Sequence, residues 1–127
     1  MKYKIWLVVN IFCLMGHPVM AITPEAARTR LAQENIPYTV AALVSYVEKG
    51  NMEVVGWFLA IGMEVDAANE FGETGLMLAS EQGHLEMVQL LLVNKANVKA
   101  RDLAKRTALM NAAQNGHVEI VKVLLEW

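Results

Sequence analysis

The chain has 127 residues, of which 55% are hydrophobic, and this length is enough for one small domain with its own core. Eleven Lys and Arg against thirteen Asp and Glu give a formal charge of −2, and this balance argues against the basic stripe that nucleic-acid binding requires. We therefore expect no nucleic-acid partner and favour neutral or basic protein surfaces as partners.

Residues 1–21 have the pattern of a secretory signal peptide. Lys2 and Lys4 give a positive start, and the apolar stretch after them is shorter than the roughly 20 residues that span a bilayer. Val19-Met20-Ala21 then supplies a small-residue cleavage site. We therefore expect an exported protein, periplasmic or secreted, that has no membrane attachment after cleavage. An uncleaved membrane anchor is the alternative.

Cleavage after Ala21 leaves 106 residues with nine basic and thirteen acidic side chains. The only cysteine, Cys13, lies in the removed segment, so the mature chain can form no disulfide and depends on packing. Residues 22–35 predict an N-terminal capping helix, which Thr23 caps and Pro24 starts. We expect its small and apolar side chains, Ala27 and Leu31, to cover the near end of the domain that begins at about residue 36.

A repeat of 33 residues covers the rest of the chain. Thr74 to Leu92 and Thr107 to Leu125 share ten identities in nineteen aligned positions, and residues 41–59 form a divergent copy with six. The repeat predicts three units, at residues 36–68, 69–101 and, incomplete, 102–127.

Each unit predicts two helices joined by a turn. The first helix begins at a threonine, which is Thr74 or Thr107 in the later units and Thr39 in the first. Gly83 and Gly116 supply the left-handed backbone that ends this helix. The second helix comes after a histidine and carries apolar residues at spacings of three and four. The sequence therefore predicts an all-α protein.

The stretches "NEFGETGLMLASEQGHLEMVQLLL" and "DLAKRTALMNAAQNGHVEIVKVLL" resemble the ankyrin-repeat family, and the likeness extends over about residues 37–127. The "TALM" start of the first helix is similar to that of exported bacterial members. The resemblance implies an ankyrin-repeat solenoid of about three helix-turn-helix units with an N-terminal capping helix. It also implies that His84 and His117 hydrogen-bond to the backbone of the neighbouring turn. In the first unit Asn51 stands at this position, and an amide can also tie a turn.

Catalytic chemistry has little support in the sequence. The His-x-Glu triplets at His84 and His117 contain part of a zinc-deaminase signature, but that site also needs a Cys-x-x-Cys pair. The mature chain has no cysteine, no activated nucleophile and no phosphate-binding loop. We expect a non-enzymatic protein without a metal or cofactor.

Ankyrin-like arrays bind other proteins through a concave face, formed by the finger that precedes each first helix and by the exposed end of that helix. The predicted partner-binding residues are Glu48, Lys49, Glu70, Phe71, Glu73, Glu81, Gln82, Leu103, Ala104, Arg106, Gln114 and Asn115. Phe71 is the sharpest candidate, because exposed aromatic rings often anchor interfaces. The alternative is that its ring folds back onto Leu103 in the next finger.

Two functions stay open. The first is a periplasmic interaction module, such as an inhibitor, an immunity protein or a protector of an enzyme; the second is a secreted effector that binds a host or foreign protein. The third unit stops at Trp127 with Val118, Val121 and Leu125 on its outer helix. A longer array, a final helix that is itself the cap, or a partner would each account for this end. The partner that covers this end could be a second copy of the chain, so self-association through this repeat is one form of that alternative.

Overall fold

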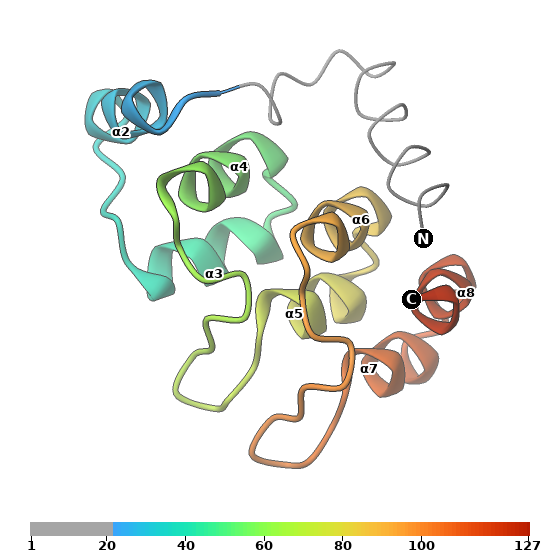
Figure 1. Ribbon diagram of the computed structural model, residues 1–127. Coiled ribbons are helices and arrows are strands. Elements are labelled where there is room, and N and C mark those ends of the chain that lie inside the picture. The colour runs from blue at the N-terminus through green and yellow to red at the C-terminus, as the bar shows by residue number, and fades with distance from the viewer. Residues whose placement is uncertain (1–21) are drawn as a thin grey trace.

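A computed structural model of the protein describes residues 22–127, so the predicted signal peptide at 1–21 lies outside the described residues (Figure 1). The described helices are α2 (Pro24–Gln33), α3 (Val40–Glu48), α4 (Met52–Ile61), α5 (Gly75–Gln82), α6 (Leu85–Val93), α7 (Ala108–Gln114) and α8 (Val118–Glu126). The all-α prediction is confirmed, because strand-like pairing in this range amounts to one isolated bridge between Ala68 and Thr74. Within the same range, no helix combines the length and apolar character needed to cross a membrane.

Four helices begin at a threonine that caps them. The Oγ1 atoms of Thr23, Thr39, Thr74 and Thr107 each accept a hydrogen bond from the main-chain N–H three residues later, at 3.2–3.4 Å. Such a bond satisfies one of the N–H groups that a helix start leaves without a partner, and contributes about 1 kcal/mol. The predicted starts of these helices are confirmed, including Thr39 in the divergent first unit.

The helices are stacked in two rows. α3, α5 and α7 lie side by side in one row, and α4, α6 and α8 form the other (Figure 1). Ala79 and Ala112 are fully buried and allow neighbouring helices of the first row to approach closely. One continuous core results, since a single unit cannot bury its own apolar face. Its largest fully buried side chains are Phe58, Leu43, Leu76, Met77, Met87, Leu90, Leu91, Leu92, Ile120, Val47 and Val55.

Helix α2 extends the second row by lying against α4. Its buried residues are Ala27 and Leu31, the two side chains expected to cover the first unit. The Tyr38 ring stacks on the buried Phe58 ring, with centroids 5.6 Å apart and planes inclined by 13°. The core is therefore covered at this end by a helix in one row and by an aromatic ring beside it.

The other end of the stack is apolar and open. Val118 and Leu125 of α8 are 59% and 69% exposed, and Met110 of α7 is 49% exposed. Ala113 is exposed as well, whereas Ser80, its equivalent one unit earlier, is completely buried. The three alternatives for this end stay open, and self-association through it stays a prediction.

The buried hydroxyl of Ser80 offers a test of what it costs to leave a polar group without a hydrogen bond in the first row. Its Oγ is buried and has no hydrogen-bond partner, which costs about 1 kcal/mol or more. We expect Ser80→Ala to raise the free energy of unfolding by about 1 kcal/mol, measured by urea denaturation. The reverse change at the exposed equivalent site, Ala113→Ser, serves as the control for helix propensity. A Ser80→Ala gain no larger than the Ala113→Ser loss would contradict the desolvation argument.

Candidate protein-binding surface

Two loops project from the same side of the helical stack (Figure 1). We name them the first finger (residues 62–73) and the second finger (residues 95–106). Asn69 shapes the first finger, because its Oδ1 accepts hydrogen bonds from the main-chain N–H groups of Phe71 at 2.9 Å and Glu73 at 3.0 Å. Asp102, the equivalent residue of the second finger, accepts one from the N–H of Arg106 at 2.9 Å. Each finger is therefore closed by a polar side chain at the same repeat position.

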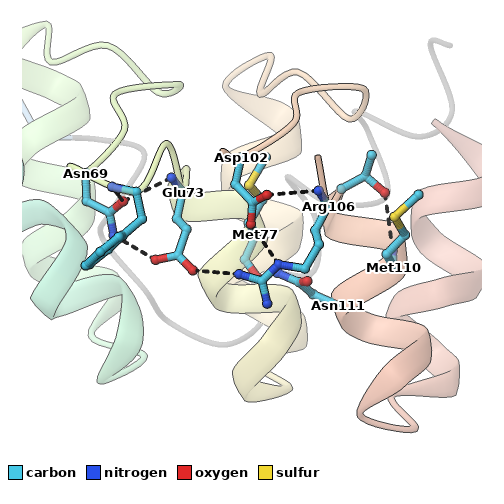
Figure 2. Close-up of polar contacts among 9 residues, drawn as sticks. Asn69, Glu73, Met77, Asp102, Arg106, Met110 and Asn111 are labelled. Atoms are coloured by element: carbon cyan, nitrogen blue, oxygen red, sulfur yellow. Dashed lines mark hydrogen bonds and ion pairs between the residues drawn. The ribbon is translucent and has the colours of Figure 1, made fainter. Parts of the chain in front are cut away.

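A row of polar side chains links the two fingers (Figure 2). Arg106 lies in the middle: its Nη2 is 3.3 Å from the Glu73 carboxylate, and its Nε donates to Asp102 at 2.9 Å. On the far side, Glu73 accepts a hydrogen bond from the Asn69 amide at 2.9 Å. Two contacts with the main chain add to this row, from Leu103 N–H to the Phe71 carbonyl at 3.0 Å and from Asn97 N–H to the Asp66 carboxylate at 2.9 Å. The fingers are thereby fixed to one another.

Asp102 is the buried charge of this row, with 6% of its surface exposed. The hydrogen bond from the Arg106 main-chain N–H lowers the pKa of Asp102 below its ordinary value of 3.8. Burial acts in the opposite direction, and the positive charge of the Arg106 side chain lowers the pKa further. The structure therefore keeps this carboxylate ionised down to acidic pH.

A histidine joins each later unit to the unit before it, and we call each unit, with its pair of helices, a layer of the stack. His84 Nε2 donates to the carbonyl of Glu48 at 2.8 Å, and His117 Nε2 donates to that of Glu81 at 2.9 Å. The role implied for these histidines is confirmed. Asn51 does not act in the same way: its Oδ1 accepts from Val54 N–H at 3.1 Å and caps its own helix. The expectation that its amide ties a turn as the histidines do was wrong, because the described residues hold no earlier first-row helix whose last carbonyl it could reach.

The predicted partner-binding residues fall into two groups. Glu73 and Arg106 are brought together and bonded between the fingers, and Glu81 is half-buried with its carbonyl bound to His117. The remaining members are exposed: Glu48, Lys49, Glu70, Phe71, Gln82, Leu103, Ala104, Gln114 and Asn115. The Phe71 ring is 59% exposed and Leu103 is 76% exposed, so the two side chains do not bury each other although their main chains are bonded.

Sequence reasoning missed three residues of this surface. Asn69 and Asp102 shape the fingers, and the buried Asn111 donates from its amide to the Met77 carbonyl at 3.4 Å (Figure 2). A signal was available for the first two, because Asn and Asp at the first position of a turn commonly bond to the backbone two or more residues later. For Asn111 the signal was the repeat itself, because it occupies the position of Leu78 one unit earlier, which is buried.

Within residues 22–127, no three His, Cys, Asp or Glu side chains lie close enough together to bind a metal ion. A hollow of about 380 Å³ lies beside α2, and its lining is mainly apolar. It is lined by Arg28, Leu31, Ala32, Ile36, Tyr38 and Ile61.

A model of the family described as ankyrin repeats (3 copies) matches residues 41–127. The chain therefore belongs to the ankyrin-repeat family, and its stack of helix pairs with projecting fingers is an ankyrin solenoid. The fold of this family serves protein–protein interaction rather than catalysis, and the chain is an interaction module of this class. A search of curated proteins found no match to the sequence.

The contact between glycine and histidine is testable at two equivalent positions. Gly83 and Gly116 have φ of 80° and 73°, so alanine at either site costs about 1 kcal/mol or more in backbone strain. At Gly83 a Cβ would also lie 2.6 Å from Cε1 of His117, whereas at Gly116 it would meet nothing within 4 Å. We expect Gly83→Ala to lower the free energy of unfolding at least about twice as much as Gly116→Ala.

The same measurement in a His117→Ala background isolates the cause. With the imidazole removed, we expect the two glycine substitutions to have similar costs. A difference that persists in this background would show that the contact with His117 is not its origin.

The dependence of stability on acidic pH tests whether folding lowers the pKa of Asp102. A lowered pKa means that its carboxylate stabilises the fold fully above the ordinary pKa of 3.8, and that this contribution is lost as the pH falls through the lowered value. We expect the urea midpoint of the wild type to fall more steeply between about pH 5 and pH 2 than that of Asp102→Asn. Glu119→Gln, at an exposed carboxylate of α8, is the matched control. Parallel curves for the wild type and Asp102→Asn would contradict the assignment.

Proposed function

We propose that this protein is a non-enzymatic inhibitor, immunity protein or protector in the periplasm, and that it binds one partner protein across the fingers and the first row of helices. The observation that carries the proposal is the Phe71 ring. It is 59% exposed, and Asn69 holds its main chain in a fixed turn. An aromatic side chain on a rigid support loses little entropy on binding, which is typical of interface anchors.

The last turn of each first helix supports the same face. Glu48, Gln82 and Gln114 are exposed at these ends, and Lys49 and Asn115 come directly after two of them. Lys49, Gln82 and Asn115 are equivalent residues of the three units and differ in type, so this position can vary without disturbing the contacts between the units. Glu48 and Glu81 occupy equivalent positions, and the carbonyl of each accepts a hydrogen bond from a histidine of the next unit. The Glu48 side chain is exposed and that of Glu81 is half-exposed, so both remain available to a partner.

The proposed compartment rests on the sequence of residues 1–21, whose charged start, apolar stretch and Val19-Met20-Ala21 site fit a secretory signal. Cell fractionation separates this role from that of a secreted effector. Mature protein retained in the periplasm is expected for an inhibitor or protector. Mature protein found in the medium would favour the effector.

Capture of the partner from the native compartment tests the binding face. We expect Phe71→Ala and Glu81→Lys each to reduce recovery of the partner about tenfold or more, because truncating an interface anchor commonly costs about 1–2 kcal/mol or above. Glu25→Lys on α2 makes the same charge change as Glu81→Lys outside this face and serves as the control. Helical content is measured in parallel. Unchanged capture by both variants would show that the partner binds elsewhere.

A further inference from the structure

The two fingers carry opposite charges at equivalent positions of the repeat. The first finger contains four acidic residues and no basic one: Glu64, Asp66, Glu70 and Glu73. The second finger contains one acidic residue, Asp102, and five basic ones: Lys95, Lys99, Arg101, Lys105 and Arg106. These five are the majority of the nine basic residues in 22–127. The fingers therefore bear formal charges of −4 and +4 side by side.

Attraction between the two fingers of one molecule accounts for little of this arrangement. Among the described residues, one ion pair joins them, between Glu73 and Arg106. Asp102 is buried and pairs with Arg106 of its own finger, and Asp66 is half-buried. The remaining charged side chains are exposed and form no ion pair within residues 22–127: Glu64, Glu70, Lys95, Lys99, Arg101 and Lys105. Most of both charges consequently faces solvent and is available to another molecule.

An apolar side chain accompanies the charges on each finger. Phe71 on the first finger is 59% exposed, and Leu103 on the second is 76% exposed. Their main chains are joined by the hydrogen bond from Leu103 N–H to the Phe71 carbonyl at 3.0 Å, so these two exposed residues are neighbours. The two fingers thus carry exposed apolar groups together with exposed charges, a composition that fits a small protein interface with a polar rim.

We propose that the fingers bind a second copy of the same chain about a two-fold axis that passes between them. Such an axis places the first finger of each copy opposite the second finger of the other, so a surface with charges of −4 and +4 is complementary to itself. An acidic or a basic partner protein would match one finger and be repelled by the other. Nucleic acid would meet the acidic finger and a chain of net charge −2.

Self-association through the fingers goes beyond the proposed function and acts on it. Phe71 and Leu103 also belong to the proposed partner-binding face, so the dimer and the partner complex compete for the same side chains. The dimer forms where the protein is concentrated and the partner is absent. When the partner is present, it binds the monomers, and the dimer dissociates by mass action.

Sedimentation of the purified protein without any partner tests the proposal. We expect a monomer–dimer equilibrium whose dissociation constant rises about tenfold or more between about 0.01 M and 1 M salt, as the Debye length falls from about 30 Å to 3 Å. Two variants each cancel the charge of one finger. They are Lys99→Glu/Arg101→Glu in the second finger and Glu64→Lys/Glu70→Lys in the first. Each alone is expected to be monomeric at concentrations where the wild type is dimeric.

Mixing the two variants is the decisive measurement. The intact first finger of one variant meets the intact second finger of the other, so one of the two finger contacts is restored. We expect a heterodimer of intermediate affinity that neither variant forms alone. The control, Arg28→Glu/Arg30→Glu on α2, changes the net charge as much as Lys99→Glu/Arg101→Glu but leaves the fingers intact, and is expected to dimerise like the wild type. Circular dichroism confirms that each variant is folded.

Several results would overturn the proposal. A wild type that stays monomeric at low salt would do so, and so would a dimer that persists in both finger variants. Persistence would place self-association elsewhere, for example on the open face of α8. A wild-type monomer whose second finger binds an acidic peptide would instead identify another protein as its occupant. Because the experiment uses the purified protein alone, its failure leaves the test by partner capture unaffected.

Discussion

The structure depends on one contact that recurs between layers. The ring of a histidine lies against a glycine of the preceding layer, and the ring N–H donates a hydrogen bond to a main-chain carbonyl at the end of the first helix of that layer. Those carbonyls belong to Glu48 and Glu81. The last carbonyls of a helix have no partner within it, so the imidazole satisfies a group that would otherwise need water. Each ring lies close against a glycine: a Cβ would come within 3.1 Å of the His84 ring at Gly50 and within 2.6 Å of the His117 ring at Gly83. This contact fixes the distance between the layers.

Because the layers are held at a fixed distance, residues 33 positions apart become neighbours. The fingers show the effect most clearly. Glu73 and Arg106 occupy the same position of successive units and form the ion pair between the fingers. An array without disulfides must gain its stability from such contacts between units, since no unit has a complete core of its own. The end beyond α8 lacks a further layer within the described residues, and its apolar side chains are exposed accordingly.

The same geometry separates residues that hold the array from residues free to bind. A side chain at a finger position either contacts the next finger, as Glu73 does, or remains exposed, as Phe71 does. Only the second kind can change without cost to the fold. The charged residues of the fingers include both kinds. Glu73 and Arg106 join the fingers by an ion pair, and the exposed charges give the surface an acidic and a basic side that a partner can recognise.

The sequence alone determined the all-α class, the repeat, the threonine caps and the glycine positions, because each of these depends on residues that lie within one turn or recur at a fixed interval. It also identified Phe71 as an exposed ring but left open whether Leu103 would cover it. The tertiary structure decided that question. It also placed Glu73 and Arg106 in an ion pair between the fingers, gave the buried Asn111 a partner in the preceding unit, and showed Asn51 capping its own helix. These outcomes depend on which atoms of adjacent layers come within hydrogen-bonding distance, and no local pattern specifies that distance.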